Sequence, residues 1–173
     1  MADRYLTVAG TGVHEIEIRR SRFLCALAPV TSEEAAREVI AARKKADPAA
    51  RHHCHAFVLG ADGRTQRSSD DGEPAGTAGT PMLEVLRRRE LTDTVAVVTR
   101  YFGGVLLGAG GLIRAYGQAV SEAVDVVGVR EYRRRGPGRG DRRNLAAHLV
   151  SDKDGSNRPY HSRAQRGIAT RPG

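Results

Sequence analysis

The chain has 173 residues, which is enough for one ordinary domain with or without a tail. Hydrophobic residues make up 40% of it, sufficient for a core, and the formal net charge is +8. Residues 129–173 hold 12 of the 28 basic residues and 4 of the 20 acidic ones, so residues 1–128 are neutral as a whole. The overall charge therefore does not indicate a basic binding face on the folded part.

Cysteine content and apolar stretches exclude several protein classes. Cys25 and Cys54 are too few for a disulfide scaffold and form no Cys-x-x-Cys pair, so we expect reduced thiols. The first ten residues lack the apolar run of a secretory signal. The longest uncharged apolar stretch, residues 101–113, is shorter than the roughly 18 residues of a membrane span. We expect a cytoplasmic protein with no membrane partner.

The first third of the chain is predicted to form strands and then a helix. Residues 13–30 alternate in polarity as strands do. Residues 31–45 have helical character, and a capping box is expected in which Thr31 accepts a backbone amide and Glu34 reaches back to Thr31.

The rest of the body is predicted to alternate strands and helices. A strand over 52–60 is followed by a short polar strand and a small-residue loop within 65–79. A helix is expected from Pro81, a buried central strand over 94–102, and a helix from about Gly110 to Gly128. The apolar side of this last helix is expected to comprise Leu112, Ile113, Tyr116, Val120, Ala123, Val124 and Val127. The order indicates an α+β or two-layer α/β domain.

Residues 129–173 break this pattern. They are rich in Arg, Gly and Pro and contain only five Val, Leu, Ile or Phe residues. Such a segment buries too little apolar area to offset its ordering entropy, so we expect a disordered tail. It is either an arm that attracts RNA or a solvated tail without a role.

The stretch "TRYFGGVLLGAGGLIRAYG" (99–117) has many glycines but no nucleotide-binding motif. It lacks the Lys and hydroxyl residue of a Walker A loop and the third glycine of a dinucleotide fingerprint. A strand, glycines and a helix remain, and the free amides of the helix start, with Arg100 and Arg114 nearby, would suit an anion. The alternative is that the glycines only let the strand and helix pack closely.

The stretch "SSDDGEPAGTAGTP" places three carboxylates together in sequence. Asp70, Asp71 and Glu73 are close enough to share a Mg²⁺ ion or to serve as an acid and a base. Asp-Asp-Gly is also ordinary turn chemistry, so the spacing alone leaves both interpretations open.

The stretch "HHCH" does not predict a zinc site. In a strand, His53 and His55 share one face and His52 and Cys54 share the other, and no second Cys/His pair stands at zinc-finger spacing. We therefore expect structural histidines. No G-x-S-x-G motif is present, and no catalytic or metal-ligating residue is assigned.

The motifs "SRFLCALAPV", "HHCHAFVLG", "SDDGEPAGTAGTP" and "VVTRYFGGVLLGAGGLIRAYG" resemble, in order and spacing, those of the IMPACT or YigZ family. The resemblance covers residues 13–130. It implies the fold of the second domain of ribosomal protein S5: a two-layer α+β sandwich whose antiparallel or mixed sheet carries its helices on one face. We accordingly expect an N-terminal lead (1–12), an Impact-like domain (13–128) and the tail (129–173).

The family resemblance also implies a link to translation. Eukaryotic members regulate translational control through a stress-kinase activator, and bacterial members are proposed to bind nucleic acid. The family has no established catalytic residues, so only positions that match its motifs are carried over: Asp70, Asp71, Gly72, Glu73, Thr77, Arg100, Tyr101, Gly103, Gly104, Gly108, Gly110, Gly111, Arg114 and Tyr116.

The chain departs from the bacterial pattern after about residue 130. Bacterial members resemble one another in having a ferredoxin-like second domain there, whereas this chain continues with the Arg-rich segment. The hypothesis is a truncation or a shifted reading frame, which the encoding DNA would decide.

Three functions follow as hypotheses. The favoured one is a non-catalytic module that binds RNA or the ribosome, with Arg100, Arg114 and the tail on phosphates and Tyr101 or Phe102 stacking on bases. The alternatives are a protein-interaction adaptor in translational stress control and a phosphate- or nucleotide-binding enzyme. In the enzyme, Mg²⁺ would be held by Asp70, Asp71 and Glu73; no other cofactor is expected.

Overall fold

The computed structural model describes residues 4–133, and the predicted tail from residue 134 onward lies outside this range. The elements, in chain order, are β1 (Arg4–Val8), β2 (Gly12–Ile18), β3 (Ser21–Pro29), α1 (Glu33–Ala46), β4 (His52–Leu59), β5 (Thr65–Ser69), α2 (Gly79–Arg88), β6 (Thr94–Tyr101), α3 (Gly108–Val127) and β7 (Val129–Arg133). No helix in this part of the chain is long and apolar enough to cross a membrane.

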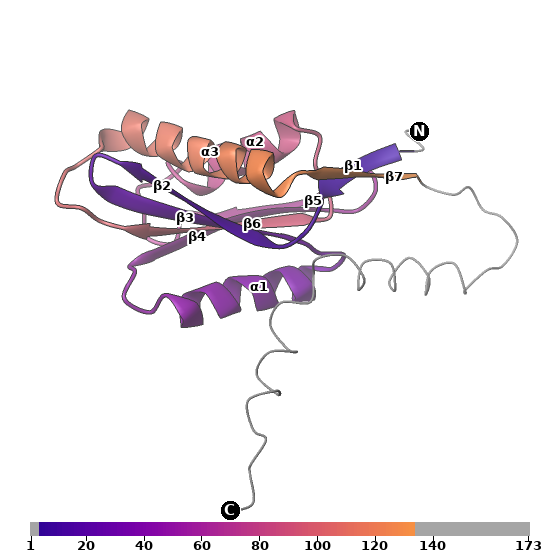
Figure 1. Ribbon diagram of the computed structural model, residues 1–173, viewed down its shortest axis with the longest axis horizontal. Coiled ribbons are helices and arrows are strands. Elements are labelled where there is room, and N and C mark those ends of the chain that lie inside the picture. Colours follow the sequence, from indigo (N-terminus) through magenta and orange to yellow (C-terminus); the bar gives the residue numbers. More distant parts are fainter. Residues whose placement is uncertain (1–3, 134–173) are drawn as a thin grey trace, which may run out of the picture. The chain divides into compact units, whose positions relative to one another are not determined.

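Five strands form an antiparallel sheet in the order β2-β3-β6-β4-β5 (Figure 1). The β-branched strand β6 lies at its centre, as its nearly continuous apolar sequence predicts, because side chains on both of its faces are buried. The predicted α+β class and antiparallel sheet are confirmed.

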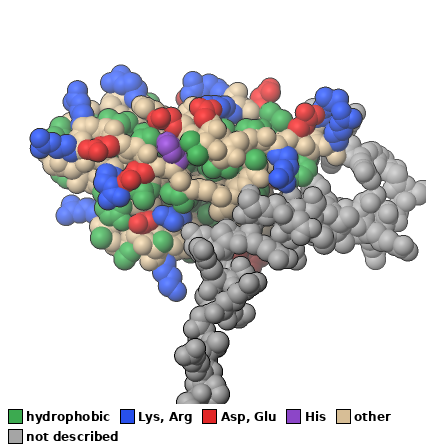
Figure 2. Space-filling view, viewed as in Figure 1, with side chains coloured by type: hydrophobic (Ala, Val, Ile, Leu, Met, Phe, Trp, Pro, Cys, Tyr) green, Lys and Arg blue, Asp and Glu red, His purple; other side chains and the backbone are tan. Residues whose placement is uncertain are grey.

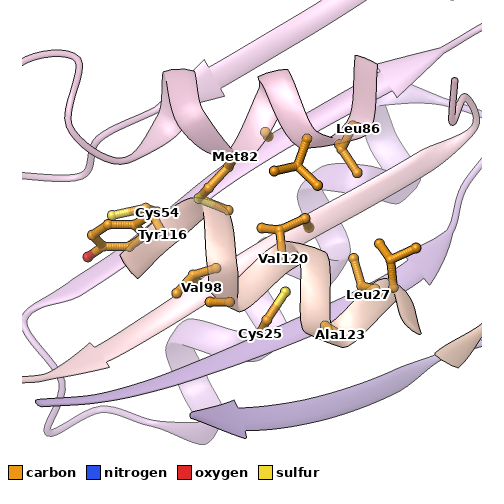
Figure 3. Close-up of a cluster of buried hydrophobic side chains, with 14 of the residues drawn as sticks. Cys25, Leu27, Cys54, Met82, Leu86, Val98, Tyr116, Val120 and Ala123 are labelled. Atoms are coloured by element: carbon orange, nitrogen blue, oxygen red, sulfur yellow. The ribbon is translucent and has the colours of Figure 1, made fainter. Parts of the chain in front are cut away.

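Helices cover both faces of this sheet, so the expectation of helices on one face only is wrong. Helices α2 and α3 pack on one face over side chains that include Phe23, Cys25 and Leu27, and part of this core is drawn in Figure 3. Helix α1 packs on the opposite face, over Phe57 and Val97 (Figure 1). Successive residues of a strand point to opposite faces, so the doubly apolar central strands require cover on both sides.

A separate two-stranded ribbon joins the two ends of the described chain. Strand β1 pairs with β7 in antiparallel register from Arg4–Arg133 to Val8–Val129. Val8 is buried in the core beneath α2 and α3. The folded unit therefore includes residues 129–133, which the sequence assigns to the tail, and part of the predicted lead.

The helices confirm one of the local predictions made from the sequence and contradict two others. Ser32, one residue after the expected Thr31, caps α1 by accepting the amide of Ala35 at 3.1 Å, so the Thr31 capping box is wrong. Helix α3 begins at Gly108 and, as predicted, ends at Gly128, whose φ is +86°. Ile113 is 43% exposed, so the predicted apolar side of α3 is wrong at this position.

Candidate functional site

The sequence motifs meet at one end of the five-stranded sheet. β4 begins at His52 opposite Arg100, near the end of β6, and His55 lies opposite Ser69, the last residue of β5. Two loops leave the sheet at this end. We name residues 70–78, between β5 and α2, the acidic loop, and residues 102–107, between β6 and α3, the glycine loop.

The acidic loop inserts Glu73 into a buried polar cluster. Arg100 Nη1 donates to both carboxylate oxygens of Glu73, at 3.0 and 2.9 Å, and the Tyr116 hydroxyl donates to Oε2 at 2.7 Å. His52 Nε2 lies 3.2 Å from Oε1. Burial raises the pKa of Tyr116 far above its ordinary value, so the phenol keeps its proton and acts as a donor. The cluster joins the acidic loop, β4, β6 and α3.

This cluster changes the role expected for Arg100. Its guanidinium, in a residue only 7% exposed, lies over the rings of Phe23 and Phe102 at 5.7 and 5.6 Å and is held by Glu73. An outside phosphate could reach it only by displacing the carboxylate and the ring. In this structure Arg100 is a positioning group for the two loops.

Asp70 secures the other side of the acidic loop. Its Oδ1 accepts the amides of Ala78 and Gly79 at 3.1 and 2.8 Å, and its Oδ2 accepts the amide of Gly76 at 2.8 Å. Ala78 and Gly79 are the N-cap and first residue of α2, so Asp70 caps that helix from outside it. Partial burial raises the pKa of Asp70, but the three amide bonds together outweigh burial and hold it below its usual value.

The three candidate carboxylates do not converge on a common ligand position. Asp71 Oδ2 accepts the amide of His53 at 2.8 Å, and Asp71 Oδ1 lies 3.9 Å from Lys44 Nζ. Asp70 and Glu73 have the separate partners described above. Within residues 4–133, no group of three or more His, Cys, Asp or Glu residues is placed to hold a metal ion.

The "HHCH" residues point as the strand alternation predicts. Cys54 belongs to the core beneath α2 and α3, and its thiol donates to the Asp70 carbonyl at 3.0 Å. Burial raises the pKa of Cys54 to about 12, which keeps the thiol protonated and unreactive. On the other face, His53 Nδ1 lies 3.0 Å from Thr99 Oγ1, and burial lowers the pKa of His53. His53 is therefore a structural histidine, as expected.

Close packing accounts for part of the glycine loop. A Cβ at Gly103 would lie 2.0 Å from the backbone oxygen of Arg20, so only glycine fits against the β2–β3 turn. Gly104 and Gly108 have φ values of +86° and +72°, which side chains rarely adopt. Gly110 has no such restriction, since a Cβ there would meet only the end of the Arg114 side chain, at 3.9 Å.

The exposed groups at this end include arginines and large apolar side chains, together with the acidic residue Glu17 at the end of β2. Phe102 is 57% and Leu106 81% exposed. Arg19, Arg20 and Arg114 are exposed and form no ion pair within the described range. Figure 2 shows Lys and Arg side chains projecting from the end on the left, where the glycine loop lies in Figure 1.

A hollow of about 260 Å³ connects these cations to the start of α3. Arg19 from the β2–β3 turn and Leu107, Gly111 and Arg114 from α3 and the residue before it contribute to its lining. Within residues 4–133, the N-cap residue Leu107 forms no side-chain capping bond to α3, and the first turn of this helix holds no acidic residue. Sequence reasoning found Arg114 but missed Arg19, although two consecutive arginines at a hairpin turn were a usable signal.

Comparison with known proteins identifies the family of the chain and agrees with its fold. The Impact N-terminal domain matches residues 19–124. The chain belongs to this family. Its relatives include the IMPACT family member YvyE of Bacillus subtilis, 56% identical over 131 residues, which are 76% of this chain and 60% of YvyE. The resemblance drawn from the motifs is thereby confirmed.

A second relative and a solved structure are also similar to this chain. YigZ of Escherichia coli is 49% identical over 110 residues, covering 62% of this chain and 54% of YigZ. A crystal structure of a hypothetical protein aligns with a TM-score of 0.73 at 41% identity, covering 77% of this chain and 66% of that one. The chain spans 60% of the length of YvyE and 54% of the length of YigZ.

Proposed function

We propose that this Impact N-terminal domain is a non-catalytic module that binds RNA through the end of the sheet carrying the glycine loop. The observation that carries the proposal is the division of charge at this end. Asp70, Asp71 and Glu73 are all bonded to groups of the protein itself, whereas the exposed guanidinium groups of Arg19, Arg20 and Arg114 have no acidic partner in residues 4–133. Exposed, unpaired cations on one face suit a polyanion.

The backbone of the β2–β3 turn supports this proposal. Ile18 pairs with Ser21, so Arg19 and Arg20 form a two-residue turn, and their φ values are +47° and +70°. Asn-Gly is the favoured sequence for such a turn, and a residue other than glycine, asparagine or aspartate there costs roughly 1 kcal/mol or more. Two arginines at strained positions are understandable if their charge has a function.

The family supplies the biological setting. The resemblance to IMPACT proteins, whose eukaryotic members act in translational control, favours RNA of the translation machinery as the partner. The enzyme alternative is weakened because each carboxylate expected to bind Mg²⁺ already accepts hydrogen bonds from other groups of the protein. A protein-interaction adaptor is the outcome to expect if RNA does not bind.

The test uses the full chain and a fluorescently labelled, unstructured RNA, with Kd measured by anisotropy at increasing KCl concentrations. Arg20→Glu/Arg114→Glu is compared with Arg64→Glu/Arg87→Glu, which makes the same change in charge at the opposite end of the sheet. We expect the first double variant to raise Kd at least tenfold and to reduce the slope of log K against log salt by about 0.7 for each lost phosphate contact.

The control variant separates this end from the rest of the chain. We expect Arg64→Glu/Arg87→Glu to shift Kd much less, because neither residue lies at the end with the glycine loop. Equal effects of the two double variants would show that binding follows overall charge, and absence of RNA binding by the unmodified chain would overturn the proposed function.

A further inference from the structure

We propose that this end takes unpaired RNA, and that a nucleobase stacks on Phe102 while phosphates lie against Arg19, Arg20 and Arg114. The inference rests on the proposed function and specifies its ligand. It arises from the position of one exposed ring among the unpaired cations.

Phe102 is a ring held in place and yet open to solvent. The Arg100 guanidinium lies over it at 5.6 Å, and Arg100 is itself fixed by the buried Glu73. Phe102 is nevertheless 57% exposed, so the residue is open to a ligand from solvent. A ring held by a fixed support loses little conformational freedom when a base stacks on it.

The two ends of the glycine loop that carries this ring lie beside the three arginines. Gly103, the residue after Phe102, donates its amide to Ser21 Oγ at 3.3 Å and packs against the backbone of Arg20. At the other end of the glycine loop, Leu107 lines the hollow shared by Arg19 and Arg114. The loop thus begins at one arginine of the turn and ends beside the other two cations. A strand whose base meets Phe102 would bring its phosphates to these groups.

This arrangement favours single strands over a duplex. In a double helix the base faces are stacked on one another, and the deep major groove of RNA is too narrow for side chains to read. A loop-borne ring can reach a base face only where the base is unpaired, and such stacking tolerates any base. The hollow contains no acidic side chain, so its chemistry matches phosphate.

The first experiment uses Phe102→Trp in the full chain. The protein contains no tryptophan, so this variant has a single fluorophore at the proposed stacking position. We expect oligouridine or oligoadenosine to quench its fluorescence in proportion to binding. An abasic oligonucleotide of the same length, which has the phosphates without the bases, should bind more weakly and leave the emission nearly unchanged.

The second experiment measures affinity. Phe102→Leu removes the aromatic face and should raise Kd for unpaired RNA roughly 5- to 100-fold. Phe102→Trp keeps an aromatic face and should bind with a Kd close to that of wild type. Neither variant should change the slope of log K against log salt. Leu106→Ala is the matched control, because it changes an even more exposed apolar residue of the same loop. We expect it to leave Kd within about twofold of wild type, and thermal melting to show all three variants folded.

The outcomes separate this inference from the proposed function. Equal affinity for duplex and unpaired RNA, with no effect of Phe102→Leu, would overturn base stacking but leave binding through the arginines intact. Equal competition by an acidic polypeptide such as polyglutamate would also overturn it, by showing a general polyanion or protein surface. Loss of all RNA binding would remove the proposed function itself.

Discussion

The acidic loop and the glycine loop have the same place in the fold and opposite roles. Each connects a strand of the sheet to a helix on the same face, and both lie at the same end. The acidic loop directs its carboxylates inward, onto amides, a guanidinium and a phenol. The glycine loop directs Phe102 and Leu106 outward.

The difference lies in how the two helix starts are satisfied. Asp70 reaches the first amides of α2, so this helix start is closed by the protein itself. In the described part of the chain, the N-cap residue of α3 forms no such bond, and the helix begins beside exposed arginines. A motif that looks chemically active in sequence can therefore serve to hold the fold together, while the loop with few polar groups belongs to the surface that we propose for binding.

The largest effect on stability is expected from a variant that disrupts the buried cluster of Glu73 and Arg100. Glu73→Ala should lower the free energy of unfolding by about 3–5 kcal/mol, because it leaves the Arg100 cation buried without its partner. The matched control is Glu15→Ala, since Glu15 pairs with Arg22 on an exposed face and should cost at most about 1 kcal/mol. Urea unfolding followed by circular dichroism measures both.

A similar cost at the two positions would contradict the central role of the cluster. If Glu73→Ala were neutral, Arg100 would be free to act outside the protein, and the contrast between the two loops would disappear.

A smaller effect is expected at the α2 cap. Asp70→Ala should cost about 1–2 kcal/mol, because three amides lose their acceptor. The pKa of Asp70 is lowered in the folded protein, so its contribution is complete above the unfolded pKa of about 4 and is lost as the pH falls through the folded value. The difference in unfolding free energy between wild type and Asp70→Ala should therefore be larger at pH 6 than below pH 3, and a difference independent of pH would contradict the role of the charge.

The smallest effect has the opposite sign. Arg19→Asn/Arg20→Gly should raise the free energy of unfolding by about 1 kcal/mol, because asparagine and glycine adopt the two positive φ values at a lower cost than arginine. The same variant should weaken RNA binding, as expected where function is retained at the expense of stability. Thermal melting and anisotropy on one preparation test both effects, and a variant that is destabilised or binds RNA as tightly as wild type would count against a functional role for the turn.

The sequence by itself determined the class of fold, the strands of the five-stranded sheet, the three helices and the family, but not the β1–β7 ribbon. These rest on local periodicity and on long motifs, which need no knowledge of distant contacts. It also indicated the structural state of the histidines, because a strand puts His53 and Cys54 on opposite faces.

Only the tertiary structure decided which motif residues are buried and which are available. The spacing of Asp70, Glu73 and Arg100 in the sequence does not show whether each is buried or exposed, because a sequence does not reveal which group a charged side chain will pair with. Glu73 and Arg100 are 27 residues apart and meet because antiparallel pairing brings β4, β5 and β6 to one end. The pairing of β3 with β2 and β6 places Arg20 beside Gly103, so the binding surface that we propose arises from contacts distant in sequence.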